Sequence, residues 1–265
     1  MKTRKLVNLR SFPLFSTVSY LTFFILYAPI ALVIAYSFNV NRTAQIWTGF
    51  STKWYLDVLT NDDIVKAVKN SLIVALPATI LATTLALAAT LGLQRMGRKG
   101  NIVSIILLGA PLIIPEIVLA VGSLCFFLFI GLPIGFIGLI VAHTAFCIPF
   151  AMLPIRARLV SLEASSFEAA ADLGANEWNI FKRVTLPLLA PGVLAGALLA
   201  FAISFDDFIT SFFVSGPGST TLPVYIFGMI RSNVTPAINA LSTMLLIGTG
   251  GILFMAYALN QDRKK

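Results

Sequence analysis

Long apolar runs separated by short polar segments set the pattern of this chain. Six of these runs are long enough, at about 20 residues or more, for an α-helix to cross a bilayer. They cover residues 14–38, 70–93, 102–130, 134–156, 190–214 and 238–260. A lipid-facing backbone must satisfy its own hydrogen bonds, and the runs lack the period-two alternation of barrel strands. The pattern therefore predicts an all-α membrane protein with six transmembrane helices.

Composition supports the membrane class and limits the partners. Hydrophobic residues make up 58% of the 265 residues and charged residues 11%, whereas a soluble domain carries about 25% charged residues. The net charge of +8 does not indicate nucleic-acid binding, because the basic residues lie between or beyond the apolar runs. With the N-terminus inside, most of the 19 Lys and Arg residues fall in inner segments. Both termini are therefore expected to face the cytoplasm.

Several features argue for a single transmembrane domain over residues 1–265. The run 14–38 is too long for the core of a signal peptide, so we interpret it as a retained span. Cys125 and Cys147 lie inside apolar runs, and we expect both to be small buried residues. They form neither a metal-ligand spacing nor a disulfide framework. The glycines that begin and end the stretch 192–196 are expected to allow close helix contact.

The outer loops carry aromatic residues and one short apolar stretch. Trp47, Trp54 and Tyr55 lie in the first outer loop and suit the membrane–water interface. Residues 224–230 in the last outer loop are too short to span a bilayer. We expect them to lie along the surface as a short helix or to re-enter the bundle.

A helix start precedes the second run. The stretch TNDDIVKAVKNSL offers Asn61 or Thr60 as the capping residue. Two acidic residues follow the cap, and negative charge is favourable at a helix N-terminus. The second helix is therefore expected to begin well before its apolar run.

The longest polar interruption in the second half of the chain lies in the inner loop between the fourth and fifth runs. Ser165 or Ser166 is placed to cap a short helix that begins near Phe167. Glu168 then lies in the favourable first turn, and Gly174 permits a sharp stop. The sequence predicts a helix of about two turns here.

A second short helix is expected over residues 177–186, EWNIFKRVTL, with Asn176 as its cap. Pro187 and Pro191 are expected to break the chain again before the fifth run. The result would be two short helices at an angle, held at the inner face of the membrane. Helix–Gly–helix spacing by itself is also compatible with a simple interfacial linker.

The residues of this insert resemble a known motif. Glu168-Ala169-Ala170, three residues, Gly174, nine residues and then Val184-Thr185-Leu186-Pro187 are similar to the EAA loop of permease subunits of bacterial ABC importers. Val184 stands where Ile is commoner in that family. The likeness covers nearly the whole chain and is greatest to the spermidine/putrescine, PotC-type branch. The segments that resemble that branch are LYAPIALVIAYSFN, WTGFSTKWY, NSLIVA, APLIIPEIVLA, AFAISFDDFITSFFVSGPGSTTLPVYIFGMIR and INALSTMLL.

This resemblance implies the type I ABC importer permease fold, in a non-catalytic subunit of the bacterial inner (plasma) membrane. The family core would cover residues 66–260 and the coupling EAA loop residues 161–189. In such importers the loop docks in a groove on an ATPase subunit, which binds ATP and Mg, and closure of two ATPases drives alternating access. The coupling residues that the resemblance implies are Glu168, Ala169, Ala170, Asp172, Gly174, Leu186 and Pro187.

The same resemblance implies the partners and the cargo. The partners are a second homologous permease subunit, an ATPase dimer and an extracytoplasmic substrate-binding protein. The cargo is expected to be a small cation, a polyamine such as putrescine or spermidine, with an opine or an amino-acid derivative as the alternative. The binding protein is expected to dock on the outer loops, at Trp47, Trp54, Tyr55, Tyr225 and Arg231.

Charged residues inside the runs are costly in lipid, at about 2.5–3.5 kcal/mol each on insertion scales, so each needs a reason. Glu116 lies halfway along the third run, after Pro111 and Pro115, which are expected to kink the helix. His143 lies at a similar depth in the fourth run. Glu116 and His143 are therefore expected either to form a buried pair or to line the path of a cationic cargo.

The fifth run contains two adjacent carboxylates, Asp206 and Asp207. Successive helical residues point about 100° apart, so one is expected to face the bundle interior and the other a neighbour or the outer interface. Phe205 and Phe208 flank the pair and would suit an ammonium ligand through cation–π contact. A capping or gate-stabilising role for the two aspartates is the alternative.

Two other function classes fit less well. An intramembrane enzyme built on Glu116, His143 and Asp206 would lack a nucleophile, and a metal site usually offers more than one His. A proton-coupled secondary transporter would have a use for intramembrane carboxylates. Such a carrier has no need of an ATPase-docking loop.

Overall fold

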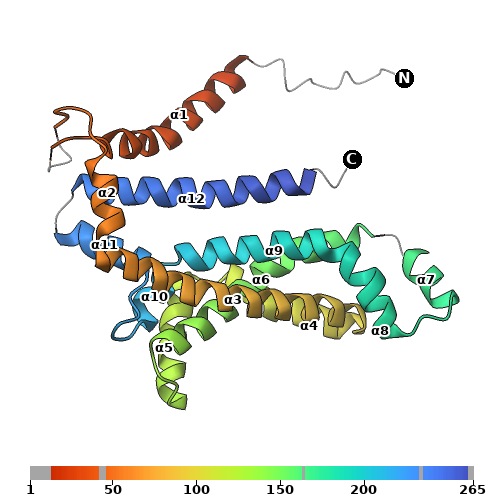
Figure 1. The fold of residues 1–265 in the computed structure, drawn as a ribbon. Helices are drawn as coiled ribbons and strands as arrows, with labels where there is room; N and C mark the ends of the chain where they lie inside the picture. The colour runs from red at the N-terminus through yellow and green to blue at the C-terminus, as the bar shows by residue number, and fades with distance from the viewer. Residues whose placement is uncertain (1–12, 42–45, 163–164, 233–234, 262–265) are drawn as a thin grey trace. The chain divides into compact units, whose positions relative to one another are not determined.

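The computed structural model describes residues 13–41, 46–162, 165–232 and 235–261. Regular structure in these ranges is helical, apart from an isolated bridge between Asn39 and Phe50. The all-α prediction is therefore confirmed. The elements, labelled in Figure 1, are α1 (Pro13–Tyr36), α2 (Lys53–Thr60), α3 (Asp62–Gln94), α4 (Arg98–Gly109), the 3₁₀ turn η2 (Ala110–Leu112), α5 (Glu116–Ile130), α6 (Phe136–Val160), α7 (Ser165–Asp172), α8 (Glu177–Ile180), the π-helix η3 (Phe181–Thr185), α9 (Leu186–Asp206), α10 (Ile209–Val214), α11 (Leu222–Ser232) and α12 (Pro236–Gln261).

Four of the described helices are long and apolar enough to cross a membrane. They run over Phe15–Tyr36, Asp62–Gln94, Phe136–Val160 and Glu177–Asp206. A bent pair, Lys99–Leu112 with Glu116–Ile130, makes a fifth span if it is counted as one. The chain is thus a multi-pass membrane protein, while the sixth span and the cytoplasmic termini stay predictions.

The chain packs as two compact units. One unit consists of Met1–Thr60 with Ser232–Ile247, and the other of Asn61–Arg231 with Gly248–Lys265. The second unit contains the interior polar cluster and the inner-loop helices described below. Whether the whole chain is one permease domain stays a prediction.

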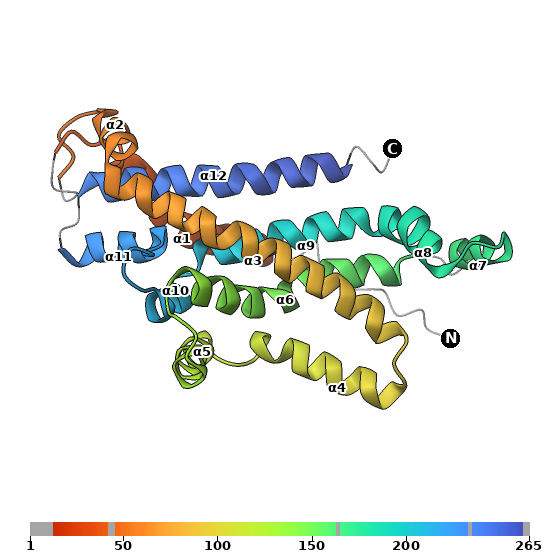
Figure 2. The same cartoon turned by 60° about the horizontal axis from the view of Figure 1, so that its bottom comes forward.

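Three helices, α3, α6 and α9, form the centre of the second unit and lie side by side in Figures 1 and 2. Small residues allow the close approach of α9 to α6, because a Cβ on Gly196 would lie 2.5 Å from the Ala151 carbonyl oxygen. A Cβ on Gly192 would lie 2.6 Å from Arg158 Cβ. The close contact predicted for residues 192–196 is therefore confirmed. The core between these helices consists of Ala82, Ala86, Leu93, Cys147, Ala151, Met152, Ile155 and Ala200.

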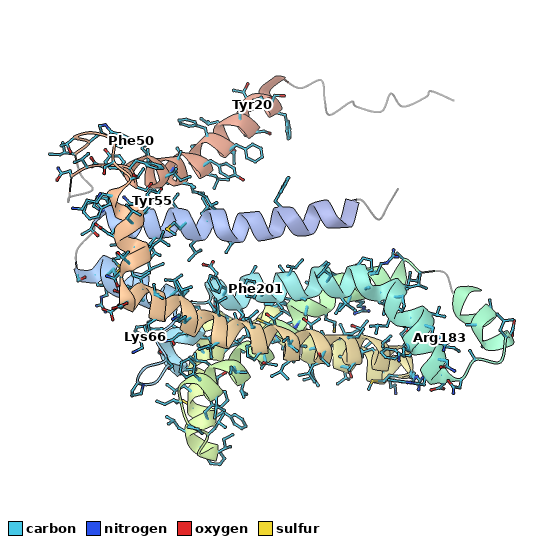
Figure 3. All side chains as sticks on the ribbon, in the orientation of Figure 1. Tyr20, Phe50, Tyr55, Lys66, Arg183 and Phe201 are labelled. Carbon is cyan, nitrogen blue, oxygen red and sulfur yellow. The ribbon has the colours of Figure 1, made fainter. Side chains whose placement is uncertain are left out.

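The start of α3 follows the sequence prediction. Asn61 is the N-cap, and its side-chain oxygen accepts the backbone N–H groups of Asp63 and Ile64. Figure 3 shows Lys66 near this start and Arg183 in η3, at opposite ends of the α3–α9 bundle. The two basic side chains thus mark the two ends of the spanning helices.

The third predicted run is broken rather than kinked. The helices on either side of Ile113–Pro115 are bent by 102°, which Figure 2 shows as the turn between α4 and α5. Pro111 and Pro115 lack the N–H groups that would continue the ladder. Glu116 is consequently the first residue of α5 and not the middle of a continuous span.

The fifth predicted run begins earlier and ends earlier than expected. Pro187 and Pro191 do not break the chain, because Glu177–Asp206 is one long helical span. The π-helix η3 precedes Pro187, and the Leu186 N–H donates to the Phe181 carbonyl in a wider turn. Pro187 directly follows this wider turn, so its missing N–H falls where the hydrogen-bond ladder already changes register. At the other end the helix stops at Asp206.

Candidate functional site

The inner loop forms the short helix α7, as predicted, with its stop at Gly174. Gly174 has a φ of +78°, the left-handed region that favours glycine. The Gly174 N–H donates to Ala171 O at 2.9 Å and the Ala175 N–H donates to Ala170 O at 3.2 Å. This is a Schellman arrangement, which satisfies the last carbonyls of a helix.

The N-terminus of α7 differs from the expectation. The helix begins at Ser165, so Ser165 and Ser166 lie inside its first turn rather than capping it. The structure describes the backbone of Glu168 within α7, but its side chain lies outside the described atoms. Asp172 and Ala169 are exposed. The described face of α7 near its C-terminus is therefore open to a partner.

The second inner helix is capped as predicted but is not separate. Asn176 accepts the Asn179 N–H at 2.9 Å, and α8 then continues through η3 into α9 at Leu186 and Pro187. Glu177 forms an ion pair with Arg95, the residue that follows α3. A cavity of about 490 Å³ lies beside this pair and is lined by Leu91, Gln94, Arg95, Leu159, Leu162, Glu177, Ile180, Phe181 and Thr185.

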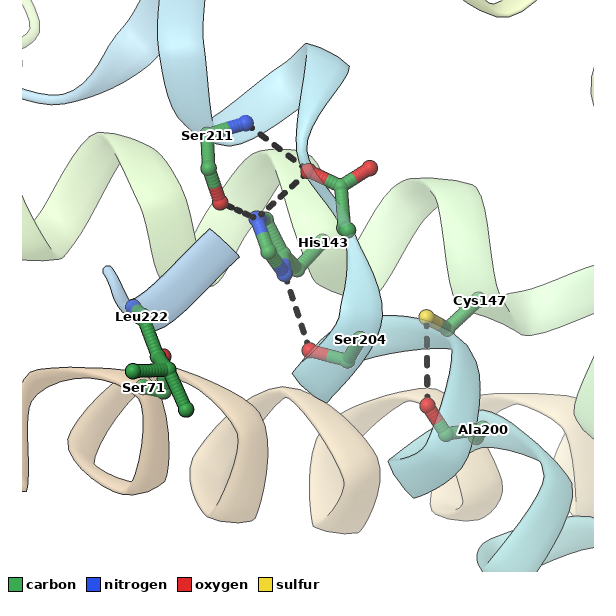
Figure 4. Close-up of polar contacts among 8 residues, drawn as sticks. Ser71, His143, Cys147, Ala200, Ser204, Ser211 and Leu222 are labelled. Atoms are coloured by element: carbon green, nitrogen blue, oxygen red, sulfur yellow. Dashed lines mark hydrogen bonds and ion pairs between the residues drawn. The ribbon is translucent and has the colours of Figure 1, made fainter. Parts of the chain in front are cut away.

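A buried polar cluster lies in the interior of the second unit, centred on His143 of α6. His143 is 1% exposed. Its Nδ1 lies 2.8 Å from Ser204 Oγ of α9, and its Nε2 lies 3.2 Å from Ser211 Oγ of α10, contacts that Figure 4 draws. One ring thus bridges three helices.

Asp207 completes this cluster at the break between α9 and α10. Its Oδ1 accepts the Ser211 N–H at 2.8 Å and lies 3.5 Å from His143 Nε2. A carboxylate that satisfies a backbone N–H in this way competes with continuation of the helix. The local cap therefore explains why the predicted fifth helix stops at Asp206.

The expected pairing of Glu116 with His143 is replaced by the pairing of His143 with Asp207. Glu116 begins α5, which packs against α10. Its carboxyl group is close enough to Asp207 for the two to interact electrostatically. Asp207 is buried and Asp206 is exposed. The two aspartates lie in different environments as expected, but Asp207 already lies beyond the helix, with an extended backbone.

Sequence reasoning missed Ser204 and Ser211 as partners of His143. Both are small polar residues in an apolar stretch, three residues before and four after Asp207. The helix breaks between these residues, so no helical spacing in the sequence pairs the two serines. Only the packing of α6 against α9 and α10 identifies His143 as their shared partner.

The two phenylalanines that flank the aspartates belong to different aromatic groups. Phe205 stacks on Phe201 with ring centroids 5.5 Å apart. Phe208 contacts Phe227 of α11 at 4.7 Å, and the Arg231 guanidinium lies 5.7 Å from the Phe227 ring centre. The second group already holds a cation on an aromatic face, as cation–π contact requires.

The expected docking aromatics of the first outer loop take part in its folding. Trp54 Nε1 donates to Asn39 O at 2.6 Å, and the Tyr55 hydroxyl lies 2.6 Å from Ser37 Oγ. Figure 3 shows Tyr55 and Phe50 in this region. Trp47 is 47% exposed. Trp47 is therefore the most available of the three for a partner.

The last outer loop is anchored to α3. Asn70 Nδ2 donates to Gly218 O and to Thr220 O, both at 3.0 Å. Tyr225 lies beyond this loop in α11, the short helix expected over 224–230, and burial together with the Asp63 carboxylate raises the pKa of its phenol. These contacts give the loop a fixed shape.

The two cysteines differ in their burial. Cys147 is buried, with its Sγ 3.6 Å from Ala200 O (Figure 4), as expected. Cys125 is exposed on α5, which corrects the expectation that it is buried. Over the described part of the chain, no three His, Cys, Asp or Glu residues are arranged to hold a metal ion.

Comparison with known families gives a match over residues 1–264, to the family described as "Binding-protein-dependent transport system inner membrane component". The chain is 38% identical over 252 residues to the putrescine transport system permease protein PotI of Escherichia coli (strain K12), covering 92% of this chain and 90% of that protein. It is 35% identical over 240 residues to the spermidine/putrescine transport system permease protein PotC of the same organism, covering 91% of each.

Solved structures share the fold. A bacterial ABC transporter involved in the import of alginate superposes with a TM-score of 0.70 at 17% identity, covering 98% of this chain and 99% of that chain. A bacterial alginate ABC transporter in complex with an alginate pentasaccharide-bound periplasmic protein gives a TM-score of 0.67 at 16% identity, over 95% and 93%. At these low sequence identities the similarity is evidence for the fold alone.

Proposed function

This chain belongs to the family of binding-protein-dependent transport system inner membrane components, and from that premise we propose that it carries polyamines, putrescine or spermidine, into the cytoplasm as a permease subunit of an ABC importer. Two relatives at 35–38% identity over nine-tenths of the chain are named for putrescine or spermidine/putrescine transport. Buried or partly buried carboxylates in the spanning region, Asp207 and Glu116, suit a cargo that carries ammonium groups.

The observation that carries the importer assignment is the α7–Gly174–α8 segment. It combines the EAA residues with a fixed helix stop and an exposed C-terminal face. In the proposal α7 docks on the ATPase subunit, with Glu168, Ala169, Ala170, Asp172 and Gly174 at or beside the contact. Leu186 and Pro187 begin α9, so a push on α7 and α8 passes directly into a spanning helix.

The partners follow from this role. A second homologous permease subunit completes the membrane pathway, and an ATPase dimer binds ATP and Mg and supplies the energy. An extracytoplasmic binding protein delivers the cargo to the outer loops, with Trp47, Trp54, Tyr55, Tyr225 and Arg231 as candidate contacts. A structural neighbour solved together with a periplasmic protein supports such a complex. The proposed location is the bacterial inner membrane.

The experiment that tests the proposal measures ATP hydrolysis by the reconstituted complex with its binding protein. Putrescine, spermidine, an opine and a set of amino acids are supplied separately. Stimulation by the polyamines is the expected result. Stimulation by an opine or amino acid alone would overturn the polyamine assignment, and failure to assemble with any ATPase subunit would overturn the importer assignment.

A further inference from the structure

His143 has more polar contacts than its two ring nitrogens need to complete their hydrogen bonds. A neutral imidazole has one donor and one acceptor, and Ser204 and Ser211 are placed to satisfy both. Yet Nε2 also faces Asp207 Oδ1 at 3.5 Å. The ring therefore lies against Asp207 in addition to its two hydroxyl partners, with the Asp207 side chain 2% exposed.

The two oxygens of Asp207 have different environments. Oδ1 accepts the Ser211 N–H and faces His143. Oδ2 is buried and has no hydrogen-bond partner within the described part of the chain. A buried carboxylate oxygen without a partner is costly, so a group that binds there has a strong driving force. The carboxyl group of Glu116 also lies near Asp207 and interacts with it.

We propose that His143 is a positioning residue, which fixes Asp207 so that Oδ2 stays free to receive an ammonium group of the cargo. The proposal rests on the proposed polyamine function. The Ser211 N–H donates to Oδ1 and the His143 ring lies 3.5 Å from the same oxygen, and together these contacts restrict rotation of the carboxylate. Without the ring, Asp207 can turn and satisfy Oδ2 locally, which removes the acceptor from the cargo.

Two substitutions separate positioning from simple core filling. The amide of Gln extends as far as Nε2, so His143→Gln keeps a polar group against Ser211 and Asp207. The amide of Asn extends only as far as Nδ1, so His143→Asn keeps the contact with Ser204 and loses the one with Asp207. Both variants are polar and smaller than histidine, and each retains one of the two contacts.

The test measures uptake as a function of putrescine concentration, using the full transporter complex in proteoliposomes. The expected result for His143→Asn is a half-saturating concentration raised by about tenfold, which corresponds to about 1.4 kcal/mol of lost cargo binding. His143→Gln is expected to stay within about twofold of the unaltered protein, with both maximal rates little changed. Equal half-saturating concentrations for the two variants would overturn the proposal.

A second pair of variants covers the case in which His143→Asn does not assemble. Ser211→Ala removes the hydroxyl that holds His143 Nε2, while Thr210→Ala truncates the adjacent buried residue. Only Ser211→Ala is expected to raise the half-saturating concentration, and equal values would again overturn the proposal. Absence of polyamine uptake by the unaltered complex would instead refute the proposed function.

Discussion

Arg95 at the end of α3 is joined to Glu177 at the start of α8 by an ion pair of 3.0 Å, across 82 residues of sequence. Both side chains are largely exposed, at 75% and 82%. An exposed pair of this kind contributes about 0–1 kcal/mol. A contact this weak links α8 to α3 and costs little to open.

Reversal of one charge should therefore weaken the contact between α8 and α3, and reversal of both charges should restore the contact. We expect Arg95→Glu to lower cargo-stimulated ATP hydrolysis by no more than about fivefold, since the pair is exposed. The double variant Arg95→Glu with Glu177→Arg is expected to recover most of that loss. Recovery in the double variant is the decisive comparison. Two single defects that simply add would contradict a direct link between the residues.

Local signals in the sequence predicted three helix ends correctly. Asn61 and Asn176 cap helices where expected, and Gly174 stops α7. Such signals work because a cap or a left-handed turn depends on only a few neighbouring residues. The pairing of His143 with Asp207 depends instead on how α6 meets α9 and α10, which no local pattern specifies.

The effects of proline and aspartate on helix continuity were harder to predict from the sequence. Pro115 breaks its span by a large angle, whereas Pro187 sits in the first turn of a continuing helix after a π turn. The same residue type thus has opposite results, because the preceding backbone supplies or withholds a wider turn. Asp207 ends α9 because its side chain binds the backbone ahead of it.

Gly174 should tolerate asparagine better than alanine. A Cβ here meets nothing within 4 Å, so the effect of substitution is purely conformational. A left-handed residue with a Cβ costs about 1–2 kcal/mol, and asparagine accepts this conformation more readily than alanine. We expect Gly174→Ala to lower the ratio of putrescine imported to ATP hydrolysed, and Gly174→Asn to lower it less. An unchanged ratio for Gly174→Ala would show that coupling does not depend on the left-handed turn at this residue.

The contact between α6 and α9 should be sensitive to a single methyl group. Gly196→Ala would place a Cβ 2.5 Å from the Ala151 carbonyl oxygen, which is backbone and cannot rotate away. Overpacking of this kind costs about 1–3 kcal/mol. The expected result is a lower thermal unfolding temperature of the purified complex. Gly92→Ala, where a Cβ meets nothing within 4 Å, serves as the matched control.

Asn70 should be required for the shape of the last outer loop. Its amide donates to two carbonyls, Gly218 O and Thr220 O. Asn70→Asp replaces this donor by an acceptor and is expected to cost about 1–3 kcal/mol locally, since the buried side chain at this position would then face two carbonyl oxygens without a hydrogen to share. Hydrogen exchange of residues 215–221 should become faster. Exchange that stays at the original rate would show that other contacts hold the loop.

The energy source of uptake tests the central claim most directly. The complete complex, with its binding protein, is placed in proteoliposomes, and labelled putrescine uptake is measured under two conditions. One supplies ATP on the side of the ATPase subunits, and the other supplies a pH gradient without ATP. We predict uptake with ATP and none with the gradient alone. Uptake driven by the gradient in the absence of ATP would contradict the importer account and favour a proton-coupled carrier.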